Sequence, residues 1–139
     1  MSRRDVYHDY VKQALVREGW QITHDPLAFK SDPALSTDLG AERPIAASRG
    51  NKKIAVEIKS FLKGSQVSEL EKAMGQYELY RWLLQEVEPD RTLYVAVPVH
   101  AYEGIFSQAI GKMVLDKLQM RLIVYPISGE GALLWIPHQ

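Results

Sequence analysis

The sequence predicts a single α/β domain in which helices flank a mixed β-sheet. Three patterns predict this class: apolar residues recur at helical spacing in three segments, they alternate with polar residues over positions 52–60, and they run continuously over positions 92–99. The length of 139 residues suits one domain, and neither a repeat nor a low-complexity linker divides it. We therefore expect residues 1–139 to fold as one unit.

The first helix is predicted over residues 3–18, where apolar residues recur on one helical face. Gly19 follows as a typical helix stop. Residues 20–29 then have the composition of a strand, in which Pro26 marks an irregularity or a sheet edge. The chain is thus expected to pass from this helix directly into the sheet.

A β-hairpin is predicted over residues 38–48 and 52–60, with its turn at Arg49-Gly50-Asn51. Successive side chains of a strand point to opposite faces, and the second arm alternates accordingly. One face carries Ile54, Val56 and Ile58, and the other carries Ala55, Glu57 and Lys59. This arm therefore has one face for a core and one face that can carry chemistry.

A second long helix is predicted over residues 68–87, with Ser68 near its start and Pro89 beyond its end. The remaining predicted elements are a buried strand, a C-terminal helix and two short strands, at residues 92–99, 103–118, 121–127 and 132–136. Gly129 and Gly131 supply the turn between the last two strands. This order of elements predicts a mixed sheet with helices packed against it.

The composition limits the classes of function. With 46% hydrophobic and 24% charged residues the chain is an ordinary globular protein, and without cysteine it has neither disulfides nor thiolate metal sites. No segment approaches the roughly 18 apolar residues that span a bilayer, so we expect a cytoplasmic protein without membrane contact. The formal net charge is +0, whereas free-standing DNA-binding proteins usually carry a basic surplus. DNA binding would therefore rely on a local basic patch, a dimer or a partner protein.

Three side chains of the predicted hairpin form the candidate catalytic group. Glu57 and Lys59 lie two positions apart on one strand face, and Asp38 lies at the start of the partner arm. Two carboxylates suit Mg²⁺ or Mn²⁺, which would polarise a phosphodiester and activate a water molecule. The lysine would stabilise developing negative charge or orient the attacking water. A glutamate and a lysine at this spacing also occur on ordinary solvated strand faces, so this motif alone is weak.

The following helix adds Gln76 and Tyr80, which share one helical face. Together these pieces resemble the PD-(D/E)XK nuclease superfamily over residues 3–97. The resemblance implies a restriction endonuclease-like αβββαβ core, here followed by a C-terminal helix and two short strands. It also implies that Asp38 and Glu57 bind the metal ion, that Lys59 assists catalysis, and that Gln76 and Tyr80 help hold DNA or the active site.

A closer resemblance covers essentially the whole chain. The segments HDYVKQALVREGWQITHDPL, TDLGAERPIAASRGNKKIAVEIKSFL and MGQYELYRWLL are similar to the XisH family. That family is named for controlling excision of the fdxN element in cyanobacteria, where it accompanies a site-specific recombinase and a small protein called XisI. The resemblance implies DNA, an XisI-like protein or a recombinase as partners. It leaves two functions open: a metal-dependent endonuclease, or a non-catalytic DNA- or protein-binding regulatory subunit.

The register of the hairpin decides which acid reaches Glu57. A two-residue turn at Gly50-Asn51 would place Glu42, rather than Asp38, opposite Lys59. Asp38 reaches the site only through a bulge, a wider turn or splayed strands, so Glu42 is an alternative ligand. Asp9 is a further alternative, because superfamily members often offer an acid from the first helix, although a solvent-facing charge is the simpler interpretation. The proline of the superfamily name is also absent, since Thr37 precedes Asp38.

Two further features concern binding. Lys52-Lys53 and Arg3-Arg4 are candidate phosphate contacts, although ordinary surface charge is the simpler interpretation. The aromatic-rich segment YELYRWLL, with Trp82 off the main apolar stripe, is a candidate contact in a homodimer or a hetero-complex.

Overall fold

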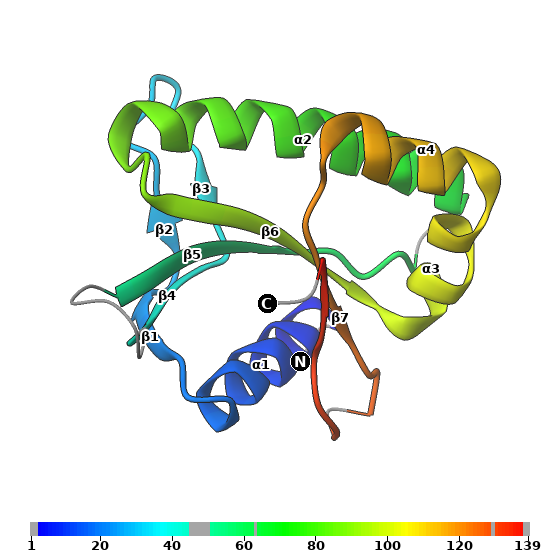
Figure 1. Cartoon of the computed structure of the whole chain (residues 1–139), viewed down its shortest axis with the longest axis horizontal. Coiled ribbons are helices and arrows are strands. Elements are labelled where there is room, and N and C mark those ends of the chain that lie inside the picture. The colour runs from blue at the N-terminus through cyan, green and yellow to red at the C-terminus, as the bar shows by residue number, and fades with distance from the viewer. Residues whose placement is uncertain (1–2, 45–50, 63, 129, 138–139) are drawn as a thin grey trace.

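The computed structural model describes residues 3–44, 51–62, 64–128 and 130–137, which form a central sheet with helices on both faces (Figure 1). Helix α1 (Arg3–Arg17) covers one face, whereas α2 (Gln66–Val87) and α4 (Ala109–Leu118) cover the other. The strands are β1 (Gln21–His24), β2 (Leu27–Ala28), β3 (Ser36–Thr37), β4 (Leu39–Pro44), β5 (Asn51–Ile58), β6 (Arg91–Pro98), β7 (Leu122–Tyr125) and β8 (Leu134–Ile136). A short helix, α3 (Val99–Glu103), and a 3-10 turn, η1 (Ile105–Ser107), join β6 to α4. The predicted α/β class is confirmed.

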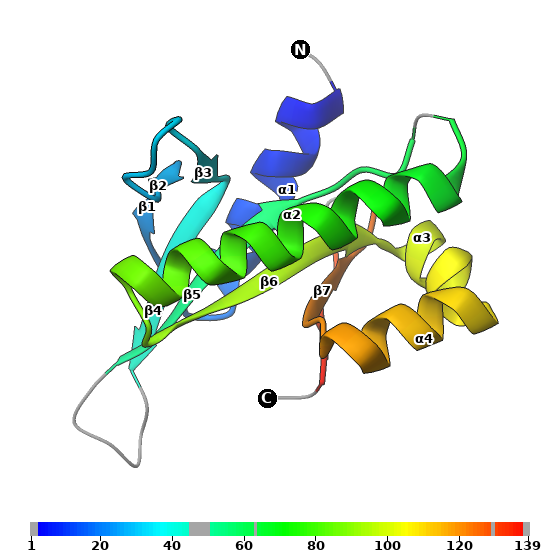
Figure 2. The same cartoon turned by 90° about the horizontal axis from the view of Figure 1, so that it is seen from above.

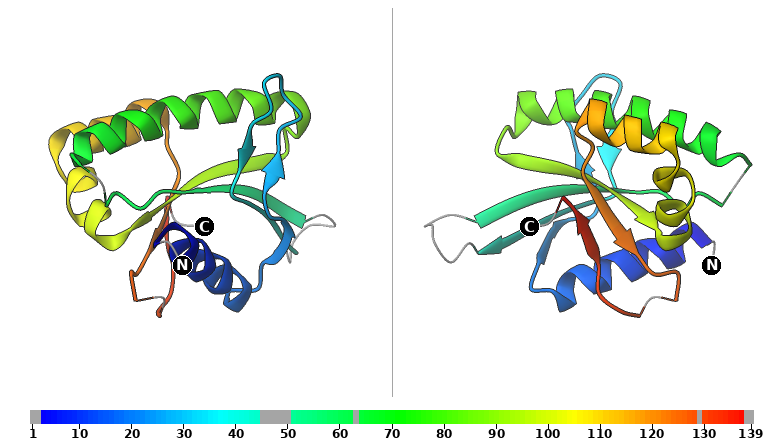
Figure 3. Two further views of the ribbon diagram at one scale, coloured as in Figure 1. Left: turned by 180° about the vertical axis from the view of Figure 1, so that it is seen from behind. Right: turned by 45° about the vertical axis from the view of Figure 1, so that its right-hand side comes forward.

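The main sheet has the strand order β1-β4-β5-β6-β7-β8. Its centre is parallel, because β6 pairs in parallel with both β5 and β7. Antiparallel pairs flank this centre, namely β1 with β4, β4 with β5, and β7 with β8. The sheet is therefore mixed, as predicted, and β2 with β3 forms a separate two-stranded sheet beside α2 (Figure 3).

The predicted strand at residues 20–29 is wrong as one continuous element. Its first part is β1 of the main sheet, and its last part is β2 of the small sheet. Pro26 lies between them and has no N–H to donate to a strand ladder. The chain therefore leaves the main sheet before Pro26 and returns to it only at β4.

The hairpin has a longer connection than a two-residue turn. Leu39 pairs with Val56, and Pro44 pairs with Asn51, so positions 45–50 form the connection. Of the predicted turn, Arg49 and Gly50 lie outside the described residues, and Asn51 belongs to β5. The register that would have placed Glu42 opposite Lys59 is wrong, because the wider connection shifts the pairing.

Two helix boundaries also differ from the prediction. Helix α2 begins at Gln66 because Ser65, and not Ser68, is its N-cap, with Ser65 Oγ accepting hydrogen bonds from the N–H groups of Val67 and Ser68. The helix predicted at residues 103–118 is divided into α3, η1 and α4. The break follows Gly104, whose ψ of -107° is not helical. The N–H of Ile105 donates to Gln66 Oε1 at 3.0 Å, which ties the break to the start of α2.

Apolar layers lie on both faces of the sheet, and Figure 2 shows α2 lying along β5 and β6. The layer under α1 contains Val11, Leu15, Trp20, Ile54, Val56 and Tyr94. The layer under α2 and α4 contains Ala55, Leu70, Tyr77, Tyr80, Leu93 and Val95. β6 is therefore covered on both faces, as its continuous apolar run predicted. In the part of the chain that the structure describes, no helix combines the length and the apolar character needed to cross a bilayer.

Candidate functional site

A cavity of about 570 Å³ lies where β5 ends, between α1 and α2. Its polar lining contains all five residues that the sequence singled out for catalysis. These are Asp38, Glu57, Lys59, Gln76 and Tyr80. They come from the segment before β4, from the end of β5 and from the middle of α2, so the fold gathers residues up to 42 positions apart.

Asp38 is held at the backbone of β5. It lies between β3 and β4, directly before Leu39, which pairs with Val56. The same register continued by one residue places Asp38 beside Glu57. The N–H of Ile58 donates to Asp38 Oδ2 at 2.7 Å, which fixes this carboxylate next to Glu57. The wider connection of the hairpin thus provides the geometry that Asp38 requires.

Glu57 and Lys59 form a largely enclosed ion pair. Lys59 Nζ lies 3.6 Å from Glu57 Oε2, and only 12% of the Glu57 side chain and 17% of the Lys59 side chain are exposed. The backbone of Lys59 is held on both sides, because its N–H donates to the Ala96 carbonyl at 2.8 Å and its carbonyl accepts the Tyr125 hydroxyl at 2.8 Å. The lysine ammonium is therefore presented to the cavity by a rigid strand end.

Tyr80 faces the two carboxylates. Burial raises the pKa of Tyr80, and the negative charges of Glu57 and Asp38 raise it further, while a hydrogen bond with the Gln76 side chain acts in the opposite direction. The phenol therefore stays protonated at neutral pH and can donate a hydrogen bond. The Oε1 atom of Gln76 is buried and has no hydrogen-bond partner among the described residues. It leaves an acceptor at the cavity for a donor on a bound molecule.

The prediction missed Glu69, which also lines the cavity. Glu69 lies in the first turn of α2, and its carboxylate approaches Lys72 Nζ at 3.8 Å. A signal was present in the sequence, because Glu69 precedes Gln76 by seven positions and a helix repeats its face at that spacing. Ser36 and Ser60 also line the cavity, and they carried no comparable signal.

The structure places both alternative ligands away from this cavity. Glu42 pairs with Lys53 in the strand register, accepts a hydrogen bond from Asn51 at 3.1 Å, and approaches Arg91 at 3.8 Å. Asp9 is exposed on α1 and is not among the residues that line the cavity. Neither carboxylate shares the cavity with Glu57.

The donor set suits one hard divalent cation. Asp38 and Glu57 supply carboxylate oxygens, and Mg²⁺ is commonly bound by one or two carboxylates with water completing its octahedral shell. Among the described residues, no group of three His, Cys, Asp or Glu side chains is arranged to hold a metal ion. Phosphate or water oxygens would therefore have to complete the shell, and the cavity has room for both.

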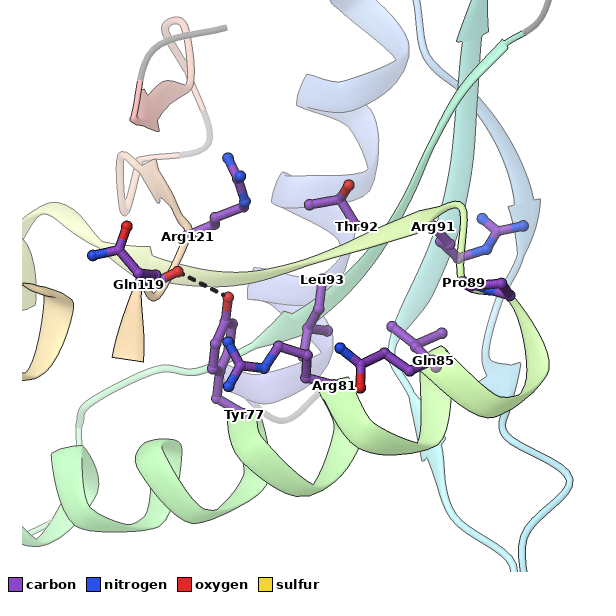
Figure 4. Close-up of a pocket in the computed structure, with 10 residues that line it drawn as sticks. Tyr77, Arg81, Gln85, Pro89, Arg91, Thr92, Leu93, Gln119 and Arg121 are labelled. Carbon is purple, nitrogen blue, oxygen red and sulfur yellow. Dashed lines mark hydrogen bonds between the residues drawn. The ribbon is translucent and has the colours of Figure 1, made fainter. Parts of the chain in front are cut away.

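A second cavity of about 260 Å³ lies at the other end of α2 (Figure 4). Its central cation, Arg81, lies 5.5 Å over the Tyr77 ring, donates to the Leu118 carbonyl at 3.2 Å and pairs with Glu78. The Tyr77 hydroxyl donates to the Gln119 carbonyl at 3.3 Å. The Arg81 charge is thus already neutralised by Glu78, and none of the predicted catalytic residues lies here.

Comparisons with known proteins give consistent matches. The family model described as XisH protein matches residues 1–132. The crystal structure of an XisH family protein from Nostoc punctiforme PCC 73102 is 38% identical, with a TM-score of 0.81 over 94% of this chain and 98% of that chain. The crystal structure of a fdxN element excision controlling factor protein from Anabaena variabilis is 41% identical, with a TM-score of 0.82 over 95% of this chain and 98% of that chain. No curated protein matches.

Proposed function

This chain belongs to the XisH family, and we propose that it acts in the excision of a DNA element through a metal-dependent site that cleaves phosphodiesters. The similar structure from Anabaena variabilis is named as a fdxN element excision controlling factor. The chain order α1, β1, β4, β5, α2 and β6 supports a restriction endonuclease-like core of the PD-(D/E)XK type. DNA is then the substrate, and a recombinase or a small XisI-like protein is the proposed partner.

One observation carries this proposal: the hairpin register brings Asp38 to Glu57 in a cavity that also contains Lys59. An ordinary solvated strand face would leave the glutamate and the lysine open to water. Here both side chains are largely enclosed, and a second carboxylate from another segment joins them. Converging acids with an adjacent ammonium suit metal-dependent phosphodiester hydrolysis.

The proposed roles follow from the positions of the side chains. Asp38 and Glu57 would hold Mg²⁺ or Mn²⁺, and such an ion supplies Lewis-acid polarisation of the phosphate and a more acidic water. Lys59 would donate to a non-bridging phosphate oxygen and stabilise the charge that develops on it. The Glu57 carboxylate, 3.6 Å from Lys59 Nζ, holds this ammonium at the cavity.

Gln76 and Tyr80 would contact the substrate. Tyr80 stays protonated, because burial and the nearby carboxylates raise its pKa, so it would donate to the DNA backbone rather than act as a base. The buried Gln76 Oε1 would accept a hydrogen bond from water or from a nucleotide donor. Both residues come from α2, so the helix sets the distance between substrate and carboxylates.

The register makes a direct prediction about the two candidate acids. Asp38→Asn is expected to lower Mg²⁺-dependent nicking of a supercoiled plasmid by more than about a hundredfold, because even residues that merely support metal ligands are worth roughly 10–100-fold. The asparagine retains an acceptor for the N–H of Ile58, so folding should persist. Glu42→Gln removes the same charge outside the cavity and is expected to leave nicking unchanged. Equal losses in the two variants would contradict the register.

Tyr125 is predicted to act as a positioning residue. Tyr125→Phe removes the hydroxyl that holds the Lys59 carbonyl, and nicking is expected to fall roughly fivefold, since losing about 1 kcal/mol of positioning costs close to that factor. Tyr77→Phe is the matched control, because it removes the same kind of bond, to Gln119, outside the cavity.

Both tyrosine variants should lose similar stability in urea unfolding, about 1 kcal/mol. Mn²⁺ affinity measured by calorimetry should be unchanged in both, because neither hydroxyl belongs to the carboxylate pair. A purely structural role for Tyr125 is indicated if the two variants lose nicking to the same extent.

A second candidate function is a non-catalytic subunit that regulates a recombinase through protein contacts. One observation favours it: Trp82 is 57% exposed and Leu79 is 42% exposed on the outer side of α2. Exposed aromatic residues are typical of protein contact sites. Measuring divalent-ion binding in the wild type and in Asp38→Asn separates the two functions. The catalytic function requires ion binding that depends on Asp38, whereas a regulatory surface at Trp82 does not require an ion.

A further inference from the structure

Three cations share one face of the sheet, and two of them lie at the end of the hairpin farthest from the catalytic cavity. Arg43 of β4 and Lys52 of β5 are directly paired across the antiparallel ladder. Arg121 directly precedes β7. We call Arg43, Lys52 and Arg121 the basic edge. Lys52 lies at the start of β5 and Glu57 near its end, so these two residues are separated by roughly 16 Å along the strand.

The side chains of the basic edge lie on the α1 face of the sheet. Residues alternate along β5, with Ile54 and Val56 packed on the α1 side and Ala55 on the α2 side, which places Lys52 on the α1 side. Figure 4 shows Arg121 and Thr92 directed to one side of β6, away from Tyr77 and Arg81. Arg121 also lines the second cavity, whereas Arg43 and Lys52 do not.

Like charges in this arrangement repel each other. Directly opposed like charges destabilise an antiparallel pair, and Arg43 with Lys52 is such a pair. Burial lowers the pKa of the Lys52 amine, and the positive charges of Arg121 and Arg43 lower it further. The folded protein thus maintains an unfavourable concentration of positive charge that a bound anion would relieve.

The other cations near this end of the sheet are neutralised. Lys53, next to Lys52 but on the opposite face, pairs with Asp90 at 3.4 Å. Buried Arg91 pairs with Glu88, and Arg81 pairs with Glu78. In contrast, no carboxylate of the described residues lies within 4.0 Å of the charged groups of the basic edge.

Arg43 is also held in place. Its guanidinium lies 5.1 Å over the Trp20 ring and donates to the Glu18 carbonyl at 3.4 Å. The Glu18 carboxylate is turned elsewhere, because it accepts hydrogen bonds from the Leu133 N–H and the Trp135 indole. A guanidinium fixed by stacking loses little freedom on binding, and its planar donors match phosphate oxygens.

We propose that the basic edge binds the phosphate backbone of DNA, as a contact separate from the catalytic cavity. A chain with a net charge of +0 needs a local patch to bind DNA, and Arg43, Lys52 and Arg121 supply one. An acidic protein is the competing occupant, but protein interfaces usually centre on apolar or aromatic surface. Here the ring beneath Arg43, Trp20, is only 2% exposed.

The test measures binding of a short fluorescent DNA duplex in EDTA, where no hydrolysis occurs, so its result does not depend on the proposed catalysis. The double variant Lys52→Gln and Arg121→Gln is compared with Lys112→Gln and Lys117→Gln, which removes two exposed positive charges on α4. The basic-edge variant is expected to bind at least about tenfold more weakly and to lower the slope of log affinity against log salt by about two, close to 0.9 per lost phosphate contact. The control variant should bind like the wild type.

Equal weakening in both double variants, or no weakening in the basic-edge variant, would overturn the assignment. If polyglutamate binding depends on Lys52 and Arg121 and DNA binding does not, the basic edge is assigned to an acidic protein instead.

A second readout follows the Lys52 amine by NMR of the dimethylated protein. The duplex should raise the pKa of Lys52, because phosphate stabilises the ammonium, and an unchanged pKa at saturating duplex contradicts the proposal.

Discussion

Replacing Glu57 with glutamine is expected to abolish Mg²⁺-dependent nicking of plasmid DNA while the protein stays folded. The substitution keeps the size of the side chain and removes the charge that would bind the metal ion. Since residues that only orient metal ligands are worth roughly 10–100-fold, loss of a ligand should exceed about a hundredfold. Mn²⁺ affinity measured by calorimetry should fall with the activity. Glu71→Gln, an exposed carboxylate on α2, is the matched control and should change neither.

Lys59→Gln separates binding from catalysis in the same assay. Lys59 lies 3.6 Å from Glu57, but an ammonium cannot bind a cation. The variant should therefore retain Mn²⁺ affinity and lose nicking, whereas Glu57→Gln loses both. If Glu57→Gln nicks DNA as fast as the wild type, the proposed hydrolytic role of this cavity is wrong, whatever the family membership.

The largest expected effect on stability comes from Gly111→Ala. An added Cβ at Gly111 would lie 1.9 Å from the Ile105 carbonyl oxygen and 2.7 Å from the Phe106 Cα. Both are backbone atoms, so the chain must shift, and we expect the free energy of unfolding to fall by about 3 kcal/mol. The damage should reach the cavity, because Ile105 is tied to Gln66 at the start of the helix that carries Gln76 and Tyr80.

Gly75→Ala is the matched control for this prediction. Gly75 lies inside α2, and a Cβ there would meet nothing within 4 Å. Alanine should therefore stabilise the protein by about 0.5–1 kcal/mol through better helix propensity. Urea unfolding measures both variants. Gly111→Ala with wild-type stability would show that α4 does not pack against η1 as closely as described.

The local parts of the site could be predicted from the sequence. Alternation along residues 52–60 correctly placed Glu57 and Lys59 together, because the period of a strand depends only on backbone geometry. Helical spacing likewise put Gln76 and Tyr80 on one face, and both line the cavity. The same helical spacing, extended by two turns towards the N-terminus of α2, also places Glu69 on this face.

The parts of the site that join distant segments of the chain could not be predicted, because the periodicity of apolar residues carries no information about contacts between segments. The length of the hairpin connection decides whether Asp38 or Glu42 meets Glu57, and the Gly50-Asn51 pair wrongly favoured a tight turn. At the break after Gly104, the N–H of Ile105 donates to the side chain of Gln66, 39 positions earlier. The basic edge likewise arises from Arg43, Lys52 and Arg121, which come together only because three strands align.

A crystal structure of the protein soaked in Mn²⁺, with anomalous difference density measured at the manganese edge, probes the metal site without assuming a substrate. We predict a single strong peak in contact with carboxylate oxygens of both Asp38 and Glu57, and its loss in Glu57→Gln crystals soaked identically. Manganese bound by Glu42 or Asp9, or no density near Asp38 and Glu57 at saturating Mn²⁺, would contradict a divalent-ion site in this cavity.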